Sequence, residues 1–135
     1  MDRRNFIRLA VAGSATGIIA PRVVLASASS MAGGLYYTKD APGRWSKKAA
    51  GHLPKIEVSG SKIQVITPHE MKAYGHFIIK HIVLDKDFKY INENMFDPTK
   101  TKSPISNFTI KNYHGPLHIL SVCNKHDTWL NVAEV

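Results

Sequence analysis

An all-β, immunoglobulin-like sandwich of seven strands is the fold that the sequence predicts. Short runs of β-forming residues alternate with turn residues such as Ser59-Gly60-Ser61 and His114-Gly115-Pro116. No segment keeps a helical period, and seven short strands within about a hundred residues are typical of this sandwich. The expected strands are residues 55–58, 62–66, 77–84, 88–92, 105–111, 117–123 and 130–135.

Residues 1–28 are expected to be a twin-arginine export signal. The pair Arg3 and Arg4 stands ahead of an apolar stretch, residues 9–20, and Ala26-Ser27-Ala28 resembles a cleavage site. This stretch is well short of the roughly 20 residues of a membrane-spanning helix, so we expect no membrane insertion of the mature chain. The sequence thus predicts export in folded form to the periplasm, with an ordinary signal or an uncleaved anchor as alternatives.

The rest of the chain is expected to form an arm and one domain. Residues 29–46 are rich in glycine and read as an N-terminal arm, and residues 47–135 are assigned to the sandwich. A chain of about 100 residues suits one small domain. Its core is large enough to be stable without disulfides.

The charge of the mature chain argues against nucleic acid as a partner. Removing the leader leaves fourteen basic and nine acidic side chains, a net charge of +5. The lysines are scattered, with no basic run and no interleaved aromatic residues. A small anion fits this distribution better, although a basic surface without a steering role is the other reading.

Five residues of metal-binding type fall at the ends of the expected strands. His52 precedes the first strand, His69 follows the second, His76 opens the third, and Cys123 and His126 lie at and beyond the end of the sixth. Loops at strand ends are where sandwich proteins usually build their sites. One thiolate with several imidazoles suits zinc, copper or ferrous iron. Five ligands favour a redox metal, because structural zinc prefers four.

The other histidines are interpreted as structural. His118 alternates to the face of its strand opposite Cys123, His81 lies within an apolar strand, and His114 belongs to a turn. A lone cysteine such as Cys123 is also typical of a buried, inert thiol, so its residue type alone leaves both readings open.

Three blocks of sequence resemble the superoxide reductase family, which includes neelaredoxin and desulfoferrodoxin. The blocks are Gly51-His52-Leu53-Pro54, then His69-Glu70-Met71 leading to His76-Phe77-Ile78, then Cys123-Asn124-Lys125-His126 with Trp129 three residues further on. The third block is the most specific. Together they span nearly the whole mature chain.

The resemblance implies a mononuclear iron enzyme that reduces superoxide to hydrogen peroxide. His52, His69, His76 and His126 would be equatorial ligands of one Fe2+/Fe3+ ion and Cys123 its axial ligand. Having a single cysteine, the chain lacks the additional four-cysteine iron centre of some members. The resemblance therefore implies an external electron donor, and it also implies that copies of the chain can associate.

The sequence departs from the family at several positions. Ala50-Gly51 replaces the usual glutamate and lysine before the first histidine, and Lys47 and Lys48 are the expected substitutes for that lysine. Glu70 stands in place of a proline and Asp127 in place of a glycine.

Two other functions stay open from the sequence. An exported cupredoxin-like electron carrier would also use cysteine and histidine, but no methionine follows His126. A catalytically silent iron-binding or sensor protein on the same fold is the second, because the usual lysine and glutamate are missing.

Overall fold

Seven strands in the described part of the chain form two antiparallel sheets, which confirms the predicted all-β sandwich. A computed structural model gives the structure, in which residues 31–135 are described; the expected export signal lies outside them. The elements in chain order are η1 (Gly43–Lys48), α3 (Ala49–His52), β1 (Lys55–Ser59), β2 (Lys62–Ile66), η2 (Ala73–Gly75), β3 (Ile78–Leu84), β4 (Tyr90–Met95), β5 (Ile105–Thr109), β6 (Pro116–Cys123) and β7 (Asp127–Glu134).

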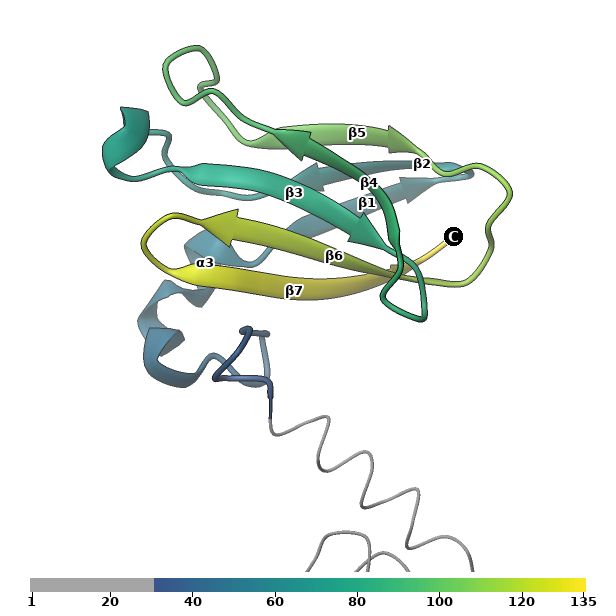
Figure 1. Ribbon diagram of the computed structural model, residues 1–135, viewed down its shortest axis with the longest axis horizontal. Helices are drawn as coiled ribbons and strands as arrows, with labels where there is room; N and C mark the ends of the chain where they lie inside the picture. Colours follow the sequence, from purple (N-terminus) through teal and green to yellow (C-terminus); the bar gives the residue numbers. More distant parts are fainter. Residues whose placement is uncertain (1–30) are drawn as a thin grey trace, which may run out of the picture.

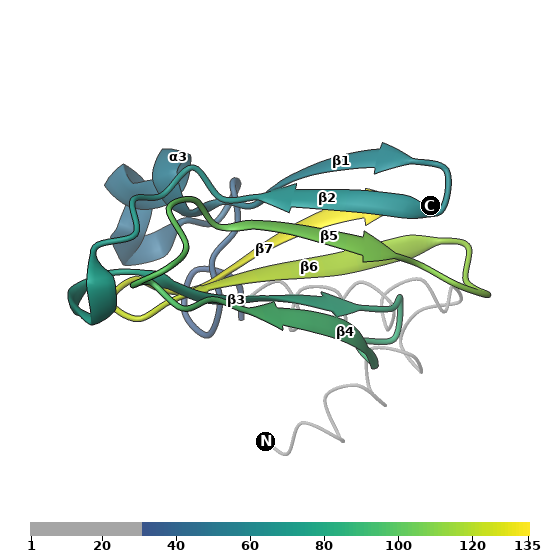
Figure 2. The ribbon, with the colours of Figure 1, turned by 90° about the horizontal axis from the view of Figure 1, so that it is seen from above.

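The two sheets have the orders β1-β2-β5 and β4-β3-β6-β7, and they stack face to face (Figure 2). Strand β5 pairs with β2, and β6 pairs with β3, as in immunoglobulin-like sandwiches. This pairing brings the end of β2, the start of β3 and the turn between β6 and β7 to one end of the sandwich, next to α3. That end lies on the left in Figures 1 and 2. We call it the site end.

The core lies between the sheets. Along β6, every second residue is buried, which places Leu117, Ile119, Ser121 and Cys123 on the inner face. The main cluster of buried apolar side chains consists of Ile63, Val65, Val83, Phe108, Ile110, Leu117 and Ile119. Cys123 is thus the last residue of the inner face of β6, at the edge of the core.

Several element boundaries differ from the predicted ones. The fourth strand begins at Tyr90 and not at Phe88, because Asp85 accepts hydrogen bonds from the backbone N–H groups of Asp87 and Lys89 and forms a turn there. Phe88 has a φ of 63°, which is incompatible with a strand. The last strand begins three residues earlier than predicted, at Asp127, because it pairs with β6 from the hairpin turn onward.

The arm packs against β7. The backbone N–H of Tyr37 donates to the carbonyl of Thr128 at 2.9 Å, and the N–H of Leu130 donates to the carbonyl of Tyr37 at 2.8 Å. The Tyr37 side chain is buried, with its ring centroid 5.6 Å from that of Trp129. The expected boundary between arm and domain, after residue 46, falls inside η1. Among the described residues, no helix is long and apolar enough to cross a membrane.

Candidate metal centre

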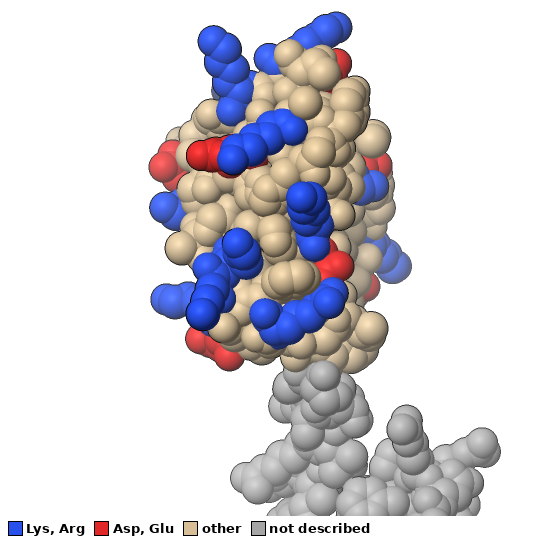
Figure 3. Space-filling model, turned by 90° about the vertical axis from the view of Figure 1, so that its left-hand side faces the viewer, with Lys and Arg blue, Asp and Glu red and all other residues tan. Residues whose placement is uncertain are grey.

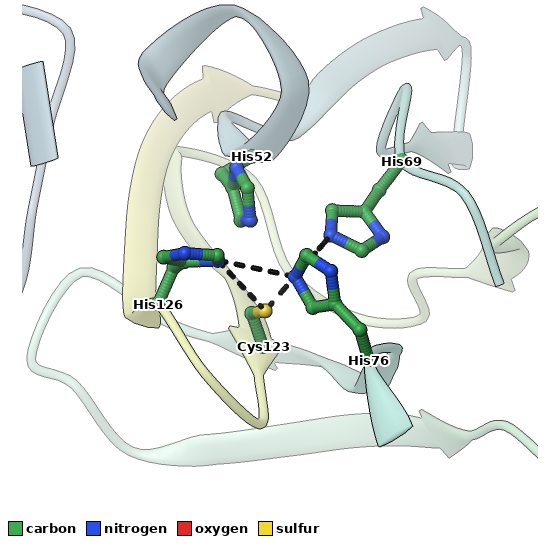
Figure 4. Close-up of side chains that lie close together, drawn as sticks. All are labelled: His52, His69, His76, Cys123 and His126. Atoms are coloured by element: carbon green, nitrogen blue, oxygen red, sulfur yellow. Dashed lines mark hydrogen bonds between the residues drawn. The ribbon is translucent and has the colours of Figure 1, made fainter. Parts of the chain in front are cut away.

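The structure brings all five predicted ligand residues together at the site end. One potential ligand atom from each of His52, His69, His76, Cys123 and His126 lies within 4.8 Å of every other. Their side chains converge from different parts of the chain: His52 ends α3, His69 follows β2, His76 precedes β3, Cys123 ends β6 and His126 lies in the turn before β7 (Figure 4). Residues 74 positions apart in sequence therefore share one cluster.

His52 has one ring nitrogen fixed and the other free for a ligand. Its Nδ1 donates to the backbone carbonyl of Lys48 at 2.8 Å. Because a carbonyl only accepts, the proton of the neutral ring lies on Nδ1 and Nε2 keeps its lone pair. This Nε2 is buried and has no hydrogen-bond partner. A buried, unpaired nitrogen that faces other imidazoles is a candidate metal-binding atom.

The other imidazoles direct their nitrogens toward the same point. His69 Nδ1 donates to the carbonyl of Glu70, and its Nε2 lies 3.0 Å from His76 Nε2. His76 Nε2 is in turn 3.1 Å from His126 Nδ1. The segment between His69 and His76, which is one residue longer than is usual in the family that the sequence resembles, does not remove His69 from the cluster.

The Cys123 thiol completes the group and is held by its own turn. Its Sγ lies 3.7 Å from His126 Nδ1 and 4.0 Å from His69 Nε2, and the side chain is buried. The backbone N–H of Lys125 donates to this sulfur at 3.5 Å. Asn124 Oδ1 accepts from the Phe77 N–H at 2.9 Å, so the cysteine turn is tied to the loop that contains His76. Such outer contacts orient metal ligands.

The site keeps its imidazoles neutral. Burial lowers the pKa of His52 to about 4, with smaller effects from the other site histidines. Burial also lowers the pKa of His69, His76 and His126. Only neutral imidazoles bind metals, so the site is prepared for an ion near neutral pH.

Positive charge surrounds the cluster. Burial and neighbouring site histidines lower the pKa of both His76 and His126, and the charges of Lys48 and Lys125 also contribute. Lys47 and Lys48 are exposed on η1. Figure 3 views the site end and shows more Lys and Arg side chains on it than Asp and Glu side chains. Lys125 is a cation that the sequence analysis did not assign to the site.

Glu70 does not enter the cluster. Its side chain is exposed, and its carboxylate lies 3.0 Å from Lys72 Nζ. The ion pair with Lys72 lowers its pKa. Glu70 therefore stands as a solvated loop residue beside the site.

The histidines interpreted as structural lie apart from the cluster. His81 is fully buried among hydroxyl groups, and His114 is exposed in the loop before β6. His118 lies on the outer face of β6 and its Nδ1 donates to the carbonyl of Asp85 at 2.9 Å. Trp129 is fully buried, and its indole N–H donates to the carbonyl of His126 at 2.9 Å, which makes it a core residue that supports the site.

The fold and the cluster together define a β-sandwich protein with a His/Cys group able to bind a metal at one end. The donor set fits a redox ion such as Fe²⁺, because it combines a thiolate with neutral imidazoles and leaves a buried nitrogen unpaired without an ion.

Solved structures of superoxide reductases resemble this chain. The neelaredoxin from Ignicoccus hospitalis is 28% identical, with a TM-score of 0.61 over 76% of this chain and 95% of that one. Superoxide reductases from Treponema pallidum (21% identity, TM-score 0.52, 62% of this chain and 67% of that one) and Giardia intestinalis (19%, 0.52, 63% and 98%) share the fold. No protein-family model and no curated protein matches the sequence.

Proposed function

We propose that this protein is a superoxide reductase with one iron per chain. The observation that supports this most strongly is the convergence of His52, His69, His76, His126 and Cys123 at one end of the sandwich. The 28% identity to the neelaredoxin from Ignicoccus hospitalis supports it independently. In the proposed reaction, superoxide takes up one electron from ferrous iron and two protons from solvent, and leaves as hydrogen peroxide.

The residues of the chain have distinct roles in this proposal. His52, His69, His76 and His126 would hold the ion with neutral imidazoles, and Cys123 would hold it as a thiolate. The bound iron would supply one electron to superoxide, which the thiolate favours by donating electron density. The Lys125 N–H stabilises the negative sulfur, and the Lys48 ammonium attracts the anionic substrate.

The proposal includes export and an external reductant. The paired arginines of the leader and the single cysteine suit a protein that binds its metal before export to the periplasm. A single redox ion would give up one electron in each turnover. A separate donor would then have to return one electron.

Metal analysis and product stoichiometry test the function together. The protein, purified after export in its own host, is expected to contain about one iron per chain, and its ferric form should absorb visible light through the thiolate. Stopped-flow mixing of the ferrous protein with superoxide should yield one peroxide for each superoxide consumed. Dismutation would yield half as much.

Matched variants connect this activity to the cluster. His126→Ala should lower iron occupancy and activity, whereas His118→Ala, on the outer face of the same hairpin, should change neither. If the purified protein contains copper and is intensely blue, the protein is an electron carrier and the proposal is wrong. If the protein binds iron but forms no peroxide from superoxide, it is a catalytically silent iron-binding protein.

A further inference from the structure

Asp127 has a backbone conformation that its residue type disfavours. It is the first residue of β7, after the turn that contains Cys123 and His126, and its φ is 62°. Glycine adopts this left-handed region at the least cost, and aspartate tolerates it better than most other residues. The position therefore retains a carboxylate where glycine would fit the turn more easily.

The Asp127 carboxylate binds two consecutive side chains of η1. Its Oδ2 accepts from Arg44 Nη2 at 2.7 Å and from Trp45 Nε1 at 2.8 Å. The Arg44 guanidinium also lies 4.5 Å from the Trp45 ring centroid, a cation–π distance. One carboxylate oxygen thus connects the start of β7 to a helix 82 residues earlier in the chain. We call this group of three residues the clasp.

The segment held by the clasp contacts the candidate metal centre in two places. The Trp45 ring meets the His126 ring at right angles, with centroids 4.7 Å apart. Three residues after Trp45, the carbonyl of Lys48 fixes His52 Nδ1. The same short segment therefore covers one imidazole and orients another.

We propose that Asp127 is a positioning residue whose clasp holds η1 against the site end. The clasp keeps the Trp45 ring over His126 and keeps the Lys48 carbonyl in place for His52. The clasp thereby shields the His126 side of the site, so that a small anion reaches the site from another side. The consequence for anion access rests on the proposed function, whereas the clasp itself can be tested in metal-free protein.

The indole N–H of Trp45 gives a direct measurement of the clasp. The chain has two tryptophans, and the Trp129 indole, bonded to the His126 carbonyl, is an internal control in the same NMR spectrum. In metal-free protein, Asp127→Gly should speed hydrogen exchange at the Trp45 indole and at the amides of residues 43–52 by about tenfold or more, a local opening. The Trp129 indole should be unaffected.

Two conservative variants separate the two bonds. Asp127→Asn keeps an oxygen acceptor for Trp45 but loses the ion pair with Arg44, so its exchange rates should be intermediate. Trp45→Phe keeps a ring over His126 but removes the donor. Its amide exchange in residues 43–52 should also rise, by less than in Asp127→Gly. Asp87→Asn, an equal charge change in the β3–β4 turn, should match the wild type.

A second measurement uses the iron-loaded protein. Asp127→Gly should speed azide binding to the ferric form severalfold at an unchanged urea midpoint of unfolding. Unchanged exchange at the Trp45 indole in Asp127→Gly would overturn the clasp. Faster exchange with unchanged azide binding would overturn its role in access. A wild-type protein that binds no iron would reject the proposed function and leave the exchange test intact.

Discussion

Two buried histidines, His52 and His81, have nearly the same exposure, 4% and 0%, but different hydrogen bonding. His81 has a partner at each ring nitrogen: Thr67 Oγ1 lies 2.8 Å from Nε2 and Ser106 Oγ lies 2.8 Å from Nδ1. His52 has a partner at Nδ1 only, and its Nε2 has none. Burial lowers the pKa of both rings to about 4, so the pKa does not distinguish them.

The difference separates a core histidine from a candidate ligand. A buried polar atom without a hydrogen-bond partner costs about 1–3 kcal/mol of stability. The unpaired Nε2 of His52 therefore destabilises the fold, which indicates a role other than packing. Hydroxyl groups complete the hydrogen bonds of His81 and make it part of the core. The unpaired nitrogen of His52 is instead available to an ion.

The largest effect is expected at the end of the inner face of β6. Cys123→Ser should keep the fold, because serine is similar in size to cysteine. It should slow the reduction of superoxide by at least about 1000-fold, which is more than the 10–100-fold typical of changes to residues that only orient a ligand. The reason is that an alcohol does not supply the charge of a thiolate. Stopped-flow kinetics at matched iron content would measure it.

Ser121 is the matched control, two residues earlier on the same face. Its Oγ lies 2.7 Å from Thr67 Oγ1 in the core network. Ser121→Ala should cost about 1 kcal/mol of stability and leave activity within about twofold. Retained activity in Cys123→Ser would rule out the proposed role of the thiolate.

The next effect concerns His52 directly. His52→Leu should weaken iron binding by about 100-fold or more, since it removes a ligand and not an outer-shell partner. The metal-free variant should lose less than about 1 kcal/mol, because the lost bond to Lys48 is offset by removal of the unpaired Nε2. Iron titration and urea unfolding of the same preparation measure both. A large loss of stability with normal iron affinity would make His52 a core residue.

His81 is expected to behave in the opposite way. His81→Leu should leave iron affinity unchanged and lower the stability at pH 7 by about 1–3 kcal/mol, because hydroxyl partners in the core lose a bond. The pKa of His81 is about 4 in the fold and about 6.5 when unfolded. The unfolded chain therefore binds more protons between these values. Above about pH 6.5, His81 therefore does not reduce the free energy of unfolding. As the pH drops to about 4, the titration of His81 lowers that free energy by up to about 3 kcal/mol.

Urea unfolding of the wild type and of His81→Leu across this pH range isolates the contribution of His81 as the difference between the two proteins, because the other histidines are the same in both. His81→Leu should have a shallower fall in stability than the wild type. An equal fall in both proteins would place the titrating group elsewhere.

Local patterns in the sequence were enough to predict the sandwich, and together with the family resemblance they indicated the five residues that the structure brings together. Alternation along the sixth strand placed Cys123 and His118 on opposite faces, and the structure has Cys123 on the inner face and His118 on the outer one. Four of the five site residues lie near strand ends, and the end of β2, the start of β3 and the end of β6 meet at the site end; the fifth, His52, ends α3.

Features that depend on distant contacts could not be predicted. Helix α3 has four residues, too few to show a helical period, and packing holds it in place. The clasp joins Asp127 to Arg44 across 83 positions, and no local pattern pairs them. The sequence suggested Lys47 and Lys48 equally as substitutes for the lysine of the family. It could not distinguish them, because the direction of a side chain on a short 3-10 helix depends on how that helix packs.

The smallest expected effect concerns these lysines. Besides burial and neighbouring site histidines, the charges of Lys48 and Lys125 contribute to lowering the pKa of both His76 and His126, which indicates positive potential near these two rings. Lys48→Ala retains the backbone carbonyl that fixes His52. It should slow the bimolecular reaction of the ferrous protein with superoxide by about two- to fivefold at low salt, and Lys125→Ala should do the same.

Salt dependence distinguishes steering from a contact role. Attraction between exposed charges weakens as the Debye length shortens to about 10 Å at 0.1 M, so the rates of the wild type and of Lys48→Ala should approach each other as salt increases. Lys47→Ala is the neighbouring control on η1 and should change the rate and its salt slope less than Lys48→Ala. If Lys47→Ala has a larger effect than Lys48→Ala, the charge that attracts superoxide is that of Lys47. If neither variant nor Lys125→Ala changes the slope, superoxide reaches the site without electrostatic guidance from these residues.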